Sequence, residues 1–130
     1  MRLLLDTHVA IWALTDPRRI APQVFEAIGD AHNEVMVSAV AVWETAIKFR
    51  LGRQDSPPFS GHEAIGHFER GGFALLGVNA AHAAYVERLP PLHADPFDRL
   101  MLAQAIVEGM QFVTYDRYLS RYDVPLLTWA

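Results

Sequence analysis

Four acidic side chains from distant parts of the 130-residue sequence are of the type that binds divalent cations: Asp6, Glu44, Asp98 and Asp116. Asp6 and Asp116 each come at or just past the end of a short apolar run that predicts a buried strand. Glu44 and Asp98 lie in predicted helices. Because sites in open parallel sheets form at the carboxyl ends of the strands, the four acids can meet at one edge. Mg²⁺ and Mn²⁺ prefer such an oxygen-only environment.

Each acid also has a purely structural explanation. Asp6 or Asp116 could cap the helical segment that follows it. Glu44 stands four residues before Lys48, which is the favourable order for a surface ion pair on a helix. The segment Asp95-Pro96-Phe97-Asp98 has the pattern of a helix start, with a capping aspartate, a proline at the first position and an acid that favours the helix dipole. The metal hypothesis therefore depends on the joint arrangement.

Apolar runs and helical spacings alternate along the whole chain. The predicted strands cover Arg2–Leu5, Glu34–Val37, Phe73–Val78, Phe112–Thr114 and Val124–Leu127. The predicted helices cover His8–Leu14 (capped by Thr7), Pro22–Ile28, Ala39–Leu51 (capped by Ser38 and closed by Gly52), Gly61–Arg70, Ala80–Arg88 and Pro96–Gly109, with a short helical segment over Arg117–Arg121. This alternation predicts an α/β fold in which helices cover both faces of a central, mostly parallel sheet of four to five strands. We expect residues 1–130 to form one domain.

Composition narrows the class of protein. The formal net charge is −4, from 15 acidic and 11 basic residues. Setting aside the four candidate ligands leaves 11 acids against 11 bases, so the rest of the chain is balanced. The sequence lacks cysteine, which excludes disulfides and thiolate metal sites. The apolar run at the N-terminus is too short for a signal peptide, and no stretch is long enough to span a membrane, so we expect a cytoplasmic protein.

Other catalytic patterns are missing from the sequence. There is no P-loop, no GxGxxG and no GxSxG segment. The six histidines are not spaced like zinc ligands, and we expect them at the surface or at helix ends: His8, His32, His62, His67, His82 and His93. Nucleophilic catalysis by a side chain therefore has no support.

Four segments together resemble the PIN-domain toxins of bacterial type II toxin–antitoxin systems, the VapC-like group. The segments are Leu4-Leu5-Asp6-Thr7-His8; Val37-Ser38 to Trp43-Glu44 with Ala46-Ile47-Lys48; Asp95-Pro96-Phe97-Asp98-Arg99 to Ala103-Gln104-Ala105; and Thr114-Tyr115-Asp116. The resemblance covers essentially the whole chain. It implies a PIN-like three-layer α/β/α sandwich and a Mg²⁺- or Mn²⁺-dependent endoribonuclease that a cognate antitoxin neutralises.

Carried over by position, the resemblance assigns catalytic and metal-binding roles to the four acids. Asp6, Glu44 and Asp98 match the three core acidic ligands, and Asp116 matches a fourth acidic position that varies more in the family. The fourth motif departs from its commonest form at Tyr115, where a small or basic residue is usual.

Further residues are candidates for supporting roles. We expect Thr7, Arg99, Thr114 and Arg117 to contact the substrate, the arginines through its phosphates. For the arginines the alternative is ordinary solvated surface. Asp95, which we expect to cap a helix, could also position the metal ligands without binding the ion itself.

The mechanism that the resemblance implies is hydrolysis of RNA phosphodiester bonds by metal-activated water, leaving a 3′-hydroxyl and a 5′-phosphate. Single-stranded or loop RNA is the expected substrate because its backbone and bases are accessible. The expected partners are a VapB-like antitoxin and a second copy of the chain. The apolar helices Val9–Leu14 and Ala39–Leu51 could form the groove or dimer surface, or could simply be core.

Two other functions compete with this one. A receiver-like signalling domain is also α/β and gathers acids around Mg²⁺, but it needs an acidic pair after its first strand and a lysine after its fifth. The only lysine here is Lys48. A catalytically inactive PIN-like binding module is the second alternative, and a nuclease assay with and without EDTA separates it from an enzyme.

Overall fold

Five parallel strands form the centre of the computed structural model, which describes residues 1–92 and 95–129. They are β1 (Arg2–Leu5), β2 (Glu34–Ser38), β3 (Ala74–Leu76), β4 (Gln111–Val113) and β5 (Leu126–Leu127). The order across the sheet is β3-β2-β1-β4-β5, and every neighbouring pair is parallel. The sequence prediction of a mostly parallel sheet of four to five strands is confirmed.

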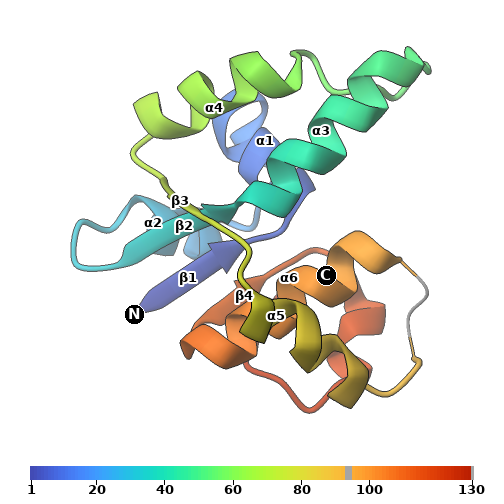
Figure 1. Ribbon diagram of the computed structural model, residues 1–130. Helices are drawn as coiled ribbons and strands as arrows, with labels where there is room; N and C mark the ends of the chain where they lie inside the picture. The colour runs from blue at the N-terminus through green and yellow to red at the C-terminus, as the bar shows by residue number, and fades with distance from the viewer. Residues whose placement is uncertain (93–94, 130) are drawn as a thin grey trace.

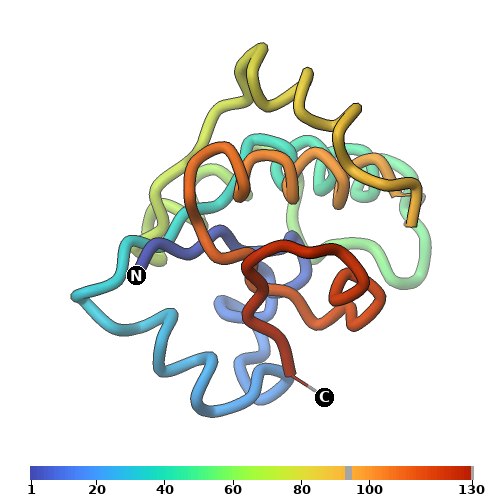
Figure 2. Tube along the Cα trace, turned by 90° about the horizontal axis from the view of Figure 1, so that it is seen from below, coloured from blue at the N-terminus to red at the C-terminus, as the bar shows by residue number. Residues whose placement is uncertain are grey.

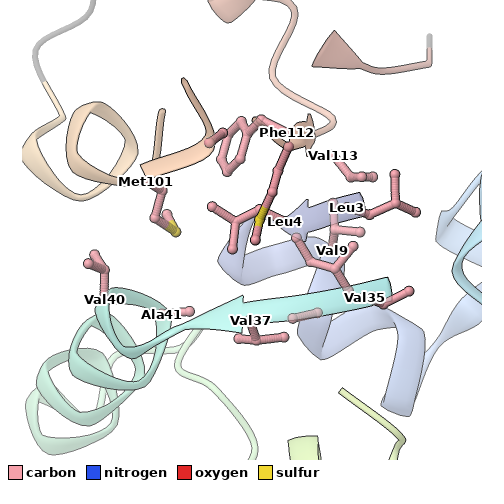
Figure 3. Close-up of a cluster of buried hydrophobic side chains, with 14 of the residues drawn as sticks. Leu3, Leu4, Val9, Val35, Val37, Val40, Ala41, Met101, Phe112 and Val113 are labelled. Carbon is pink, nitrogen blue, oxygen red and sulfur yellow. The ribbon is translucent and has the colours of Figure 1, made fainter. Parts of the chain in front are cut away.

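The central strand β1 is short and entirely apolar in its second half, which suits a strand covered on both faces. Leu3, Leu4 and Leu5 have no exposed surface. Figure 3 shows Leu3 and Leu4 among side chains from the neighbouring strands, including Val37 and Phe112. Because β1 pairs with both β2 and β4, its carboxyl end lies in the middle of the sheet edge.

Six α-helices connect the strands within the described part of the chain (Figure 1). They are α1 (Thr7–Thr15), α2 (Pro22–Gly29), α3 (Ala39–Leu51), α4 (Gly61–Arg70), α5 (Ala80–Tyr85) and α6 (Pro96–Glu108), with three 3₁₀ turns η1 (Pro17–Arg19), η2 (Val86–Arg88) and η3 (Arg117–Arg121). In Figure 2 the blue helices α1 and α2 lie on the opposite side of the strands from the olive α5 and orange α6. Helix α3 packs against α1, α4 and α6.

The helix caps explain where the helices begin and end. Ser38 caps α3 by accepting a hydrogen bond from the Val40 amide, and Gly52 closes the helix with a φ of 64°. The prediction that Thr7 caps α1 was wrong. Asp6 is the N-cap, because its carboxylate accepts a hydrogen bond from the Thr7 amide, and Thr7 is the first helical residue.

Two predicted strands are longer than the observed ones. The segment 73–78 pairs with β2 only over Ala74–Leu76, because it is an edge strand and its partner ends at Ser38. The fifth strand pairs with β4 only at Leu126 and Leu127. These changes lie away from the carboxyl ends of β1 and β4, so they leave the predicted site edge intact.

A buried polar network joins the start of α3 to α5 and α6. Ser38 Oγ donates to Gln104 Oε1 at 2.5 Å, and Gln104 Nε2 donates to the Gly77 carbonyl at 3.3 Å. His82 lies 2.9 Å from a Glu108 carboxylate oxygen and is only 1% exposed, so it is not a surface residue. It lies in the first turn of α5, as the alternative expectation of a helix-end position has it. The network satisfies polar groups that burial would otherwise penalise.

The placement of His93 lies outside the described residues. In residues 1–92 and 95–129, none of the helices has the length and hydropathy needed to cross a membrane.

Candidate active site

All four predicted acids line one pocket of about 790 Å³. It opens where the neighbouring strands β1 and β4 end, so these two strands place Asp6 and the 114–116 segment close together. Glu44 reaches it from α3 and Asp98 from the first turn of α6. The other lining residues are His8, Trp12, Lys48, Asp95, Tyr115, Arg117, Tyr118 and Arg121.

Asp6 is one of two buried carboxylates of the pocket and is 6% exposed. Its Oδ1 accepts a hydrogen bond from the Thr7 amide and its Oδ2 accepts one from Thr114 Oγ1, both at 2.7 Å. Burial raises the pKa of Asp6, the hydrogen bond from Thr114 opposes that rise, and the nearby charge of Glu44 adds to it. The site therefore holds a carboxylate whose ionisation a nearby cation would favour.

Glu44 is also buried, at 3% exposure, although it lies in the middle of a helix. Thr7 Oγ1 donates to its Oε1 at 2.8 Å, and Lys48 Nζ donates to its Oε2 at 2.5 Å. The alternative of a surface ion pair between Glu44 and Lys48 is thus wrong in one respect. The pair exists, but its acid is buried and both side chains line the pocket.

Lys48 is a site residue that sequence reasoning missed. Burial lowers the pKa of its ammonium group, but the hydrogen bond from Lys48 to Glu44 and the charges of Glu44, Asp95 and Asp98 outweigh burial and raise the pKa. Lys48 therefore stays protonated and offsets part of the negative charge of the pocket. The four-residue spacing to Glu44 was the available signal.

Asp95 and Asp116 each combine a helix cap with a place in the pocket. Asp95 caps α6 by accepting hydrogen bonds from the amides of Phe97 and Asp98, which confirms the predicted cap. Asp116 caps η3 by accepting from the Tyr118 amide, and its own amide donates to Thr114 Oγ1 at 3.0 Å. Because Asp95 and Asp116 both line the pocket, a capping role and a role in the site are compatible for each of them.

The four candidate substrate contacts differ in where their side chains lie. Thr7 and Thr114 are buried, and each hydroxyl donates to a carboxylate of the site, so both position acids. Arg99 is directed elsewhere: its guanidinium donates to Tyr122 Oη and to three backbone carbonyls, those of Val86, Leu89 and Pro90. Arg117 lies on the pocket wall, together with Arg121.

The chemistry of the donor set fits a hard divalent cation, because every candidate ligand is a carboxylate. Within residues 1–92 and 95–129, no group of three acidic or histidine side chains is arranged to hold a metal ion as it stands. The four acids nevertheless share one pocket.

The fold is an α/β domain with an all-parallel sheet and an acidic pocket, and comparison with known proteins identifies its family. The chain matches the PIN domain family over residues 3–125 and belongs to that family. It is 33% identical to Ribonuclease VapC22 of Mycobacterium tuberculosis, in an alignment that covers 98% of both chains.

Solved structures show the same fold. A chain of the VapBC2 structure from Rickettsia felis, which is bound to a DNA fragment from its promoter, superposes with a TM-score of 0.73 at 17% identity, over 100% of both chains. A chain of DNA-bound VapBC from Salmonella typhimurium gives a TM-score of 0.71 at 14% identity, over 100% of this chain and 99% of that one.

Proposed function

We propose that this protein is a Mg²⁺- or Mn²⁺-dependent endoribonuclease and the toxin of a type II toxin–antitoxin pair. The observation that carries the proposal is the meeting of four carboxylates from four remote segments in one pocket, at the carboxyl ends of β1 and β4. Membership of the PIN family and the similarity to a protein named as a ribonuclease support it. We propose the same single domain, residues 1–130, as the active unit.

Asp6, Glu44, Asp98 and Asp116 would hold the metal. When bound, a divalent cation lowers the pKa of water and offsets the charge that grows on the phosphate oxygens. A bound cation would also favour ionisation of Asp6, whose pKa burial raises.

The chain's own side chains supply orientation and proton transfer. Thr114 holds Asp6, and Thr7 together with Lys48 holds Glu44, so two carboxylates are fixed before substrate arrives. One of the pocket carboxylates takes the proton of the attacking water. The substrate phosphates require cations on the pocket wall, and Arg117 is suited to that task.

The partner of this protein is, on this proposal, an antitoxin of the VapB type in the cytoplasm. Structures of VapBC complexes share the fold, which supports an antitoxin partner. A second copy is proposed from the outer face of α3, where Trp43, Ile47 and Leu51 recur every four residues and are 54%, 37% and 54% exposed. Helix α1 is a weaker candidate for such a surface because Val9 and Ile11 are core residues.

The test is cleavage of a single-stranded, end-labelled RNA by purified protein with Mg²⁺ and with excess EDTA. We expect cleavage only with the metal, and we expect Asp98→Asn to abolish it while the metal-free melting temperature stays close to that of the wild type. Asp30→Asn is the matched control, because it makes the same change in an exposed loop residue that does not line the pocket. Cleavage that survives EDTA, or an active Asp98→Asn protein, would refute the proposal.

A further inference from the structure

A connected set of aromatic rings lies at the rim of the acidic pocket. We propose that His8, Trp12, Tyr115 and Trp129 form a platform on which the bases of unpaired nucleotides stack beside the bond to be cleaved. This inference rests on the proposed ribonuclease function and adds how the RNA is held. We call these four residues the aromatic platform.

The rings of the platform contact one another in sequence. The His8 and Trp12 rings are stacked, with centroids 5.9 Å apart and an interplanar angle of 29°. Tyr115 meets Trp12 edge to face at 5.8 Å, and Trp129 meets Tyr115 at 5.5 Å. These separations lie within the range of favourable ring contacts. The residues come from α1, from the segment after β4 and from the segment after β5, so the fold brings together rings that are far apart in sequence.

The Trp12 ring is held by its neighbours, and the Tyr115 and His8 side chains are exposed. The Arg19 guanidinium lies 4.3 Å from the centroid of the Trp12 ring, so Trp12 is held by a cation as well as by two other rings. Tyr115 is 49% exposed, and His8 is also exposed. Because its supporting contacts already order the Tyr115 ring, a base that stacks on it costs little side-chain entropy.

Three of the four platform residues line the same pocket as the acids. His8, Trp12 and Tyr115 line it together with Asp6 and Asp116. Tyr115 directly precedes Asp116, and His8 follows Asp6 by two residues. A base that rests on these rings therefore belongs to a nucleotide close to the phosphate that the acids would act on.

The surroundings favour a nucleic acid strand over a purely apolar ligand. Arg117 and Arg121 line the pocket together with Tyr115, and the Arg19 guanidinium lies over the Trp12 ring. Aromatic faces next to arginines are the combination that binds single strands, the rings taking bases and the cations taking the backbone. Bases within a duplex have their faces covered by neighbouring bases, so the platform selects unpaired nucleotides.

The test is binding, which needs no cleavage. Fluorescence anisotropy of a labelled single-stranded RNA of about ten nucleotides is measured in EDTA with the wild type and with Tyr115→Ala, Tyr115→Phe and His8→Ala. We expect Tyr115→Ala to weaken binding about 5-fold or more and Tyr115→Phe to bind within about twofold of the wild type. His8→Ala, a change at an exposed residue, keeps the test valid if Tyr115→Ala does not fold, and we expect it also to weaken binding.

Two probes and one control variant identify what the platform binds. An abasic oligonucleotide of the same length and an RNA duplex should bind more weakly than the single strand and should be insensitive to Tyr115→Ala. Phe25→Ala, on the exposed face of α2, should leave RNA binding unchanged. Equal affinity for the abasic strand, or no measurable RNA binding by the wild type, would overturn the inference.

The two proposals fail separately. RNA that binds through Tyr115 but is never cleaved in Mg²⁺ would overturn the ribonuclease function and leave the platform. RNA that Tyr115→Ala binds and cleaves with the affinity and KM of the wild type would overturn the platform and leave the function.

Discussion

Thr114→Val is the substitution that tests most sharply how the protein stabilises its central carboxylate. Thr114 has no exposed surface, and its hydroxyl donates to Asp6 at 2.7 Å while accepting from the Asp116 amide at 3.0 Å. Valine has nearly the same shape, so the change removes the hydroxyl and little else. We expect the variant to fold and to be less stable than the wild type.

The magnitude follows from the two hydrogen bonds. A hydrogen bond to a charged group contributes about 1.5–3 kcal/mol. The amide of Asp116 is partly buried, so leaving it without an acceptor costs at most the roughly 1–3 kcal/mol of a buried amide. Allowing for partial relaxation, we expect the free energy of unfolding to fall by about 2–4 kcal/mol in EDTA. For a chain of 130 residues the unfolding entropy is about 0.27 kcal/mol/K, so the melting temperature should fall by about 7–15 °C.

The difference in the free energy of unfolding between the wild type and Thr114→Val should depend on pH. The hydrogen bond from Thr114 lowers the pKa of Asp6, so its loss raises that already raised pKa further. A raised carboxyl pKa means that protonation favours the folded state. The deficit of the variant is therefore largest where Asp6 is ionised in both folded proteins, and it shrinks as the pH falls through the pKa of Asp6.

Urea unfolding of both proteins at several pH values between about 8 and about 5 measures this difference. Thr114→Ser is the control, because it keeps the hydroxyl and should lose only about 1 kcal/mol with its methyl group. A valine variant as stable as the serine variant, or a deficit that grows as the pH falls, would refute the assignment of Thr114 as the residue that holds ionised Asp6.

Three further predictions concern positions outside the metal ligands. Gly61→Ala should lose about 1–3 kcal/mol of stability, because its new methyl group would lie 2.6 Å from the Cβ of Ala46. Gly66→Ala in the same helix should instead gain up to about 1 kcal/mol. Thermal unfolding of the two variants checks this difference. Gln104→Leu should destabilise by about 1–3 kcal/mol in urea unfolding, because it leaves buried partners without a hydrogen bond. Arg99→Ala should lower the melting temperature yet keep the RNA cleavage rate of the wild type at temperatures where it is folded; a folded but inactive variant would contradict its structural role.

The sequence predicted the order of the elements and the meeting of the acids, because both follow from short-range patterns and parallel-sheet topology. The apolar run before Asp6 and the Asp95-Pro96 helix start each specify an element end, and the structure has those ends. The sequence left open whether Glu44 is a surface partner of Lys48 or a ligand, and the structure places it buried in the pocket.

What the sequence could not predict depends on contacts between remote segments. The hydroxyls of Thr7 and Thr114 hold carboxylates only because α1 lies against α3 and β4 pairs with β1. The aromatic contact between Trp12 and Tyr115 has the same origin. A histidine is a polar residue that is expected at the surface of a helix. The burial of His82 depends on its contact with Glu108, which lies 26 positions away in the chain.

The central claim, that four carboxylates form one metal site, is tested most directly by Mn²⁺ binding. Loss of the electron paramagnetic resonance signal of free Mn²⁺ gives the affinity of the wild type, of Asp30→Asn and of the four single variants Asp6→Asn, Glu44→Gln, Asp98→Asn and Asp116→Asn. We expect each of the four variants to weaken Mn²⁺ binding by about tenfold or more, and the Asp30 control to bind as the wild type does. Wild-type affinity in Asp6→Asn or Asp98→Asn, or the absence of Mn²⁺ binding by the wild type, would contradict a joint site.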